Sequence, residues 1–312
     1  SIKKAITSSL IDRYPDSACT QLTNRLAGHL GIESSNIIVG NGSMEIIRLI
    51  TCVFLTRESP SLIATPTFGE YEVACRIAGS RVIDYRTDPF NGFTVDIGSF
   101  VKLIIENQPA VVFLCNPNNP TGTQMSPEDI DRVLTACNNS LLVVDEAYIS
   151  FAAEPWSAIA LINQGNLVII RSMTKDYALA GLRLGYAAAR TEIIDLLKKV
   201  CPPWNVNAIA QNAGAVALED KTHLERCKQD IREAKEFLSQ SLQEMGLKPL
   251  PSNTHFFLIN VGNAVRFRSR LRQYGIMVRD CTSFGLPEYV RISPRSIPEC
   301  QRLVQAISEI TR

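Results

Sequence analysis

The chain has 312 residues, of which 46% are hydrophobic and 20% charged, so it can bury a large core and is not a disordered segment. Its 32 basic and 31 acidic residues nearly cancel, and no long run of one sign occurs, so an electrostatic nucleic-acid surface is unsupported. The longest apolar stretches fall far short of the ~20 residues that a membrane helix needs. These features favour a globular protein that acts on a small molecule, with no nucleic acid or membrane as partner.

The cysteine and histidine positions argue against two common kinds of site. The number of cysteines, nine, is odd and no Cys-x-x-Cys pair occurs, so no disulfide framework is expected and the predicted compartment is the reducing cytoplasm. The three histidines, at positions 29, 223 and 255, are not spaced as metal ligands, so no metal site is predicted and each is expected to be structural or exposed. The chain begins with Ser1 and no leader-like pattern, which we interpret as a trimmed or fragmentary N-terminus.

Over the first 200 residues, short apolar and β-branched runs alternate with helical patterns. This alternation is typical of crossover units on a mostly parallel sheet, so the predicted fold class is α/β with a seven-stranded sheet in a large domain. Several runs are apolar throughout, as expected of strands that helices cover on both faces. The predicted strands are Asn36–Val39, Ser61–Ala64, Val82–Tyr85, Val111–Cys115, Leu141–Val144, Leu167–Arg171 and Tyr186–Ala189.

Helices are predicted between these strands where apolar residues recur at three- and four-residue spacing. Ser126 and Pro127 supply an N-cap and a proline at the first helical position for one of them. The three clearest helical patterns are Gly42–Phe54, Gly69–Ala78 and Pro127–Cys137.

The alternation fades after residue 200, where a smaller α+β domain is predicted. A helical stretch over Ala208–Met245 leads into apolar runs at His255–Val261, Ile276–Val278 and Tyr289–Ile292, an amphipathic stretch at Ala264–Tyr274 and a terminal helix. The predicted division is residues 1–33 as the N-terminal part of the small domain, 34–220 as the large domain, and 221–312 as a linking helix with the C-terminal small domain.

Candidate chemistry begins at a lysine that directly follows the sixth predicted strand. Ligands of α/β sheets bind at the carboxyl ends of the strands, which is where Lys175 lies, although a lone lysine there is usually a surface charge. Ser172, Thr174 and Arg183 add two hydroxyls and a guanidinium, which suit a dianionic phosphate. An amine of lowered pKa can form a Schiff base with an aldehyde. An aldehyde cofactor that carries a phosphate is pyridoxal 5'-phosphate, so this set of residues predicts that cofactor.

Two further segments are weak signals alone. The stretch from Asn116 to Gly122, Asn-Pro-Asn-Asn-Pro-Thr-Gly, is an ordinary turn pattern, and Asp145 after an apolar strand is usually a turn or cap residue. Together and in this order, however, they resemble the Asn-Pro-x-Gly, Asp-x-x-Tyr and Ser-x-x-Lys segments of the class I/II aminotransferases, which are fold-type I pyridoxal-phosphate enzymes. The resemblance covers about residues 2–312 and implies the fold-type I architecture of a large domain with a smaller α+β domain.

The resemblance implies a role for each matching residue. Lys175 would carry the cofactor and act as the catalytic base, and Asp145 would keep its pyridine nitrogen protonated so that the ring accepts electrons. Tyr148 and Asn119 would bind its phenolic oxygen. Phe68 would stack on the ring, although such a residue is more often plain core. The helix start at Gly42, Ser43 and Met44 would bind the phosphate together with Ser172, Thr174 and Arg183. The remaining match is Tyr14, which relatives lend to the phosphate of a neighbouring subunit. The last match implies an obligate homodimer.

The branch of the superfamily that this chain most resembles holds histidinol-phosphate aminotransferase and threonine-phosphate decarboxylase, which both act on phosphorylated amines. Arg291 matches the arginine that binds the substrate carboxylate, Asn119 is a further substrate contact, and Arg279 and Arg295 could add a phosphate site. Together with residues 203–208 and 278–285, these arginines favour the decarboxylase, with the aminotransferase as the alternative. The choice depends on whether the Cα–H bond or the Cα–carboxylate bond stands across the cofactor ring.

Two other functions are retained as remote alternatives. A nucleotide-binding oxidoreductase lacks support because no G-x-G-x-x-G pattern follows an early strand. A non-catalytic cofactor-binding protein is suggested only by the start of the chain, since family members begin some tens of residues earlier with an arm that crosses the substrate pocket. That difference bears on closure over the substrate and leaves the predicted cofactor site unchanged.

Overall fold

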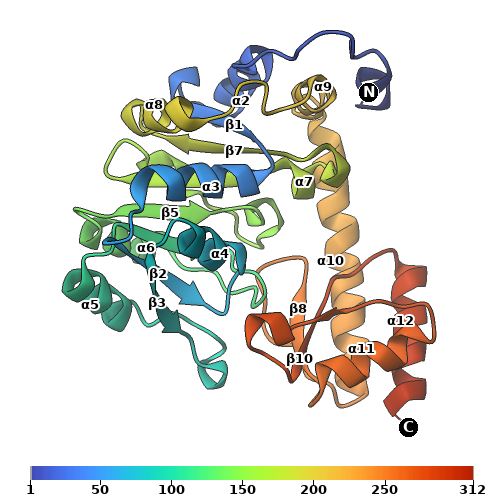
Figure 1. The fold of residues 1–312 in the computed structure, drawn as a ribbon. Helices are drawn as coiled ribbons and strands as arrows, with labels where there is room; N and C mark the ends of the chain where they lie inside the picture. The colour runs from blue at the N-terminus through green and yellow to red at the C-terminus, as the bar shows by residue number, and fades with distance from the viewer. Residues whose placement is uncertain (1, 312) are drawn as a thin grey trace.

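The computed structural model describes residues 2–311, except the side chain of Lys221. Seven strands form one sheet in the order β1-β7-β6-β5-β4-β2-β3, and three form a second sheet in the order β8-β10-β9 (Figure 1). In the large sheet the pairings from β6 to β3 are parallel, whereas β7 is antiparallel to both of its neighbours. The α/β class with a mostly parallel seven-stranded sheet is therefore confirmed.

The predicted strands are all present, and most of them are one or two residues longer than the apolar runs that predicted them. Polar residues such as Thr65, Asp145 and Ser172 continue the hydrogen-bonded ladder after the apolar pattern has ended. Asn36 is the exception, because it belongs to a short 3-10 turn before the first strand. The strands of the large sheet are β1 (Ile37–Asn41), β2 (Pro60–Thr65), β3 (Arg81–Arg86), β4 (Val111–Cys115), β5 (Leu141–Asp145), β6 (Leu167–Ser172) and β7 (Leu184–Ala189).

Helices cover both faces of the large sheet, as the apolar strands require. Successive strand residues alternate between two clusters: Val143 packs with α3, α4 and α8, and its neighbour Val144 packs with α5 and α6. Ser126 caps α6 by accepting a hydrogen bond from the Asp129 N–H (3.1 Å), which confirms the predicted start. These helices are α3 (Ser43–Phe54), α4 (Glu70–Ile77), α5 (Ile97–Asn107), α6 (Pro127–Ala136) and α8 (Thr191–Val200).

The N-terminal helices pack at the β1 edge of the large sheet. Leu22 and Leu26 of α2 join a cluster with Val39 and Leu184 from β1 and β7 and with residues of α9. The predicted boundaries at residues 33 and 220 stay a prediction. The helices of this group are α1 (Ile2–Thr7), α2 (Thr20–Leu30) and α9 (Ala208–Ala217).

The helical stretch predicted over Ala208–Met245 is two helices, because the chain turns at residues 218–220. Asp220 starts the second helix by accepting a hydrogen bond from the His223 N–H (3.1 Å). That helix, α10, runs from the large sheet to the small one, where it packs with α12 and the small sheet (Figure 1). The apolar run at Ile276–Val278 precedes β9 and is not itself a strand.

The small sheet and its helices complete the architecture. Among the described residues, no helix combines the length and apolarity needed to cross a membrane. The elements of this part are α10 (Lys221–Glu244), β8 (Phe257–Asn260), α11 (Ala264–Arg272), β9 (Arg279–Asp280), β10 (Tyr289–Ile292) and α12 (Ile297–Thr311).

Candidate active site

A cavity of about 120 Å³ lies at the carboxyl ends of β4, β5 and β6, beside the N-terminus of α3. Parallel strands that end at one edge bring distant parts of the chain together there. The cavity gathers the predicted residues Ser43, Met44, Phe68, Asn119, Asp145, Tyr148, Ser172, Thr174, Lys175 and Arg183. It is also lined by Tyr71, Cys115 and Ala147, which no pattern in the sequence predicted as site residues.

Asp145, the last residue of β5, is buried at the floor of this cavity. The Tyr71 hydroxyl donates to its Oδ2 (2.7 Å) and the Ala147 N–H donates to its Oδ1 (2.9 Å). Burial raises the pKa of the Asp145 carboxyl, and these two hydrogen bonds oppose the rise. No cationic side chain among the described residues forms an ion pair with it. A buried carboxylate in this situation suits a protonated ring nitrogen as its partner.

Lys175 belongs to the short helix α7 (Met173–Asp176) that directly follows β6. Its amine lies 5.6 Å from the centre of the Tyr148 ring. Burial lowers the pKa of the Lys175 amine, and the positive charges of Arg291 and Arg183 lower it further. Asp145 opposes this shift. The lowered pKa increases the fraction of neutral amine, which is the nucleophilic form.

Hydroxyls, a guanidinium and a helix start converge on one side of the cavity. The Ser172 and Thr174 hydroxyls are 2.8 Å apart and buried. Gly42 precedes α3 with φ +77°, and a Cβ built on it would lie 2.9 Å from Nη2 of Arg183. The guanidinium therefore lies directly against the turn that begins the helix. The first amides of α3 have no carbonyl partner within the helix, so the group would suit a phosphate as a cradle of donors.

Arg291 extends from β10 of the small sheet to Asn119, one of the residues that line this cavity. Its Nη1 donates to Oδ1 of Asn119, and its guanidinium lies 4.8 Å from the centre of the Phe256 ring. Its Nε is buried and has no hydrogen-bond partner among the described residues. Burial raises the pKa of the Tyr148 phenol to about 12, against the opposing charge of Arg291. Arg291 thus has unused donor capacity at the cavity edge.

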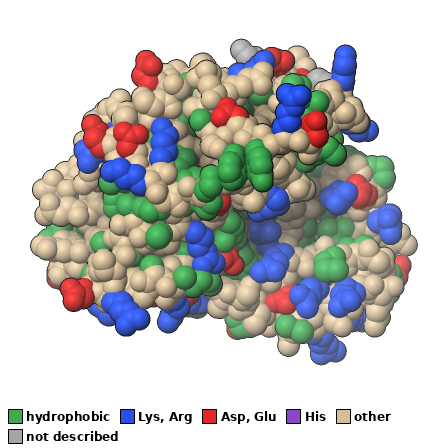
Figure 2. Space-filling view, turned by 45° about the horizontal axis from the view of Figure 1, so that its top comes forward, with side chains coloured by type: hydrophobic (Ala, Val, Ile, Leu, Met, Phe, Trp, Pro, Cys, Tyr) green, Lys and Arg blue, Asp and Glu red, His purple; other side chains and the backbone are tan. Residues whose placement is uncertain are grey.

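The three predicted substrate arginines line a second cavity of about 620 Å³. Arg279 is exposed and donates to the Ser283 hydroxyl (2.8 Å). Arg295 forms an exposed ion pair with Glu299 (2.7 Å), so its charge is partly neutralised. In the space-filling view, Lys and Arg side chains gather around a hollow of the surface (Figure 2). A concentration of positive charge of this kind favours anionic ligands.

Tyr14 does not line either cavity. The residue is 79% exposed, and its ring stacks on Trp204 at 4.5 Å between ring centres. The predicted contact with a neighbouring subunit's phosphate stays a prediction.

Tyr71 could have been found from the sequence only by its place in the segment that follows β2. It lies on the amphipathic helix α4, where a buried aromatic residue is expected to be plain core. Cys115 ends β4, and burial raises the pKa of its thiol, which keeps the thiol protonated and unreactive.

The fold and the site together define a pyridoxal-phosphate-dependent enzyme of fold type I. The buried Asp145, the lysine amine of lowered pKa and the phosphate cradle fit this cofactor. Residues 1–307 match the model of the family described as aminotransferase class I and II, and the chain belongs to that family.

Relatives across the family cover almost the whole chain. A histidinol-phosphate aminotransferase of Caldicellulosiruptor saccharolyticus is 35% identical over 316 residues, 99% of this chain and 87% of that protein. The crystal structure of L-threonine-O-3-phosphate decarboxylase from Porphyromonas gingivalis has a TM-score of 0.89 at 30% identity and covers 99% of this chain and 94% of that one. The structure of a histidinol-phosphate aminotransferase from Sinorhizobium meliloti, solved with pyridoxal 5'-phosphate, has a TM-score of 0.91 at 24% identity, covering 99% and 86%.

Proposed function

We propose that this enzyme is an aminotransferase of the histidinol-phosphate type, which moves an amino group between a small phosphorylated amine and 2-oxoglutarate. The arginines in the sequence favoured a threonine-phosphate decarboxylase, but the similarity to histidinol-phosphate aminotransferase over 99% of the chain supports the alternative better. When bound, pyridoxal 5'-phosphate supplies an aldehyde that takes up amines covalently and a ring that accepts electrons from a bond broken at the adjacent carbon.

The geometry of Arg291 carries this proposal. Its hydrogen bond to Asn119 fixes the guanidinium at the edge of the cofactor cavity. An arginine fork there would hold the substrate carboxylate at two points. Arg291 would thereby hold the carboxylate so that the Cα–H bond, and not the Cα–carboxylate bond, would be the one activated when the cofactor is bound. This arrangement favours amino transfer over loss of carbon dioxide.

The other residues would divide the remaining tasks. Lys175 would take the proton from Cα and return it, while Asp145 would keep the ring nitrogen protonated. Asn119 and Tyr148 would donate hydrogen bonds to the phenolic oxygen. The cradle at the start of α3 would bind the cofactor phosphate through Gly42, Ser43, Met44, Ser172, Thr174 and Arg183, with Phe68 against the ring.

Arg279 and Arg295 would bind the second anion of the substrate, its phosphate. Both line the cavity that Arg291 also reaches, so one phosphorylated amine could contact all three side chains. Since Arg295 is paired with Glu299, Arg279 is expected to contribute more of the binding. The same cavity also keeps the decarboxylase as the second candidate, because phosphothreonine carries both a carboxylate and a phosphate.

One pair of assays separates the two candidates. Purified enzyme with cofactor is supplied with histidinol phosphate plus 2-oxoglutarate, and glutamate is measured. In parallel it is supplied with phosphothreonine, and carbon dioxide is measured. Glutamate without carbon dioxide supports the proposal; carbon dioxide without glutamate replaces it with the decarboxylase.

We also propose that two copies of this chain form the functional unit. Leu10, Ile11 and Tyr14 are 60%, 82% and 79% exposed, which is unusual for three large apolar side chains so close in sequence. A second copy covering this segment would bury them and bring Tyr14 to the neighbouring cofactor phosphate. A cytoplasmic location stays a prediction.

A further inference from the structure

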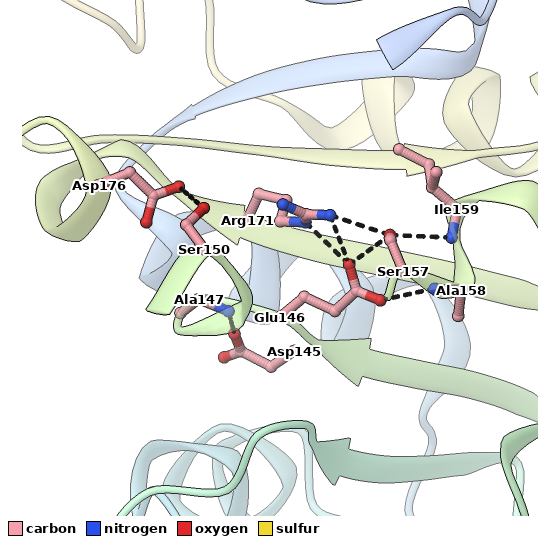
Figure 3. A network of polar contacts seen from close by, with 9 residues as sticks. All are labelled: Asp145, Glu146, Ala147, Ser150, Ser157, Ala158, Ile159, Arg171 and Asp176. Atoms are coloured by element: carbon pink, nitrogen blue, oxygen red, sulfur yellow. Dashed lines mark hydrogen bonds and ion pairs between the residues drawn. The ribbon is translucent and has the colours of Figure 1, made fainter. Parts of the chain in front are cut away.

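Lys175 lies between two polar residues of its own segment that each contact a second segment of the chain. Arg171 precedes the lysine and Asp176 follows it. Both side chains reach the segment that begins directly after Asp145: Arg171 contacts Glu146, and Asp176 contacts Ser150 (Figure 3). The two strand ends that supply the main cofactor residues are therefore joined twice, outside the cavity itself.

The first pair, Glu146 and Arg171, is buried, and both carboxylate oxygens of Glu146 accept hydrogen bonds. The Glu146 side chain is 1% exposed and that of Arg171 is 13% exposed. Nε and Nη2 of Arg171 both lie 2.8 Å from Oε2 of Glu146. The Ser157 hydroxyl donates to the same oxygen (2.7 Å) and accepts from Arg171 Nη2 (2.9 Å), while the Ala158 N–H donates to Oε1 (2.8 Å). This network fixes the direction of both long side chains.

The second pair is simpler, and both of its residues are half-buried. The Ser150 hydroxyl donates to Oδ2 of Asp176 at 2.8 Å. Oδ1 of Asp176 is buried and has no hydrogen-bond partner among the described residues. The hydroxyl of Ser150 is therefore the contact that determines how Asp176 is held.

In the part of the chain that the structure describes, backbone hydrogen bonds do not connect the segment after β5 to the segment around Lys175. The parallel ladder between β5 and β6 ends where Asp145 pairs with Ile170, and the last backbone bond runs from Glu146 N to Ile170 O (2.8 Å). Beyond that point, among the described residues, residues 147–150 and 171–176 are linked by side chains. Burying an ion pair brings little net stability compared with apolar packing, so its directional geometry is the better explanation for its presence.

We propose that the Glu146–Arg171 and Ser150–Asp176 pairs form a clamp of positioning residues, which holds Lys175 in register with Asp145 and Tyr148. The proposal rests on the proposed function, in which these three residues contact one cofactor. The clamp residues do not touch the cavity, and they act by keeping its two walls at a fixed distance. Loss of either pair would allow the lysine segment to shift relative to the carboxylate.

The test of the first pair replaces both of its members, so that no unpaired charge is left. The double variant Glu146→Leu with Arg171→Met fills the same space with apolar groups, so the apparent melting temperature of the cofactor-free protein should change little. We expect its Kd for pyridoxal 5'-phosphate, measured by absorbance titration, to rise about tenfold or more. The pH midpoint of the bound cofactor's absorbance should also move. A matched double variant at the distant Arg25–Glu219 ion pair, Arg25→Met with Glu219→Leu, should change neither quantity.

The second pair gives an independent test with a conservative control. Ser150→Ala removes the hydroxyl and should raise the cofactor Kd and shift the pH midpoint in the same direction. Asp176→Asn keeps an acceptor for Ser150 and should leave both near the wild-type values. If the apolar double variant does not fold, this pair decides alone: equal Kd and equal pH midpoint in Ser150→Ala and wild type would overturn the clamp.

Failure of the proposed cofactor site is recognised separately. Wild-type protein treated with cofactor and borohydride should retain a covalent adduct that Lys175→Ala lacks. An equal adduct in the two proteins refutes the site and with it the basis of the clamp. A Lys175-dependent adduct with unchanged Kd and pH midpoint in the clamp variants refutes the clamp only.

Discussion

At the scale of single residues, Asp145 shows how burial and chemistry are linked. Its carboxylate is buried and receives two hydrogen bonds, from Tyr71 and from the Ala147 N–H. Asp145→Asn removes the negative charge but keeps the side-chain volume. We expect cofactor binding to persist and kcat to fall at least a hundredfold, because a neutral amide does not hold a proton on the ring nitrogen. Steady-state kinetics at saturating cofactor measure this; an unchanged kcat would exclude the electron-sink role.

Asp176 is predicted to make stability depend on pH. Burial raises the pKa of its carboxyl from 3.8 to about 6, so between these values the folded protein binds the proton more tightly than the unfolded chain. The free energy of unfolding contributed by this group therefore falls as the pH rises from about 4 to about 6 and stays low above that range.

The substitution Asp176→Asn should remove this loss of unfolding free energy at higher pH. Urea unfolding near pH 7.5 is expected to show the variant more stable than wild type by up to about 3 kcal/mol, and the difference should vanish near pH 3.5. Asp131→Asn, which changes an exposed carboxylate on α6, is the control. If the difference in unfolding free energy between Asp176→Asn and wild type does not depend on pH, the raised pKa of Asp176 is contradicted.

At the scale of elements, the close approach of β7 to the start of α3 positions the residues proposed to bind the cofactor phosphate. A Cβ added to Gly185 would lie 2.5 Å from Ser43 N and 2.8 Å from the carbonyl carbon of Gly42, and neither backbone atom can move independently. Gly185→Ala should therefore displace the helix start, lower stability by about 1–3 kcal/mol and weaken cofactor binding. Gly181→Ala, where a Cβ would meet no atom within 4 Å, should leave both unchanged. Thermal unfolding and cofactor titration of the two variants provide the comparison.

The elements themselves follow from the sequence where one physical signal dominates. Strand β4 is apolar throughout, and its predicted bounds agree with the structure to the residue. The break between α9 and α10 was missed because Asp220, which caps the second helix, lies in a polar stretch that is equally compatible with a continuous helix. Tyr71 was missed because its burial on α4 is that of any core residue, and its hydroxyl acquires a role only through Asp145, 74 positions away.

At the scale of the whole molecule, the placement of the small sheet beside the large one creates side-chain contacts that local sequence patterns do not predict. The contact of Arg291 with Asn119 joins residues 172 positions apart, and it exists because α10 places the small sheet against the cavity edge. The sequence identified both residues through resemblance to a family, whereas their hydrogen bond depends on the placement of β10. The clamp around Lys175 was likewise invisible in the sequence, since Glu146 and Arg171 are ordinary charged residues until two strands end side by side.

The proposed dimer leads to a prediction about shared sites. If Tyr14 serves the neighbouring subunit, Tyr14→Ala and Lys175→Ala remove different halves of one active site. Each variant alone should have little activity. A mixed dimer would hold one complete site, made from the Tyr14 of one chain and the Lys175 of the other.

Random exchange between equal amounts of the two variants places half of the chains in mixed dimers, each with one working site of two. Activity should therefore recover to about a quarter of the wild-type value after subunit exchange. Light scattering should show twice the mass of one chain throughout. A mixture that stays inactive although exchange is demonstrated with a tagged chain would place Tyr14 outside the neighbouring site, and its stack on Trp204 would then be the side chain's main role.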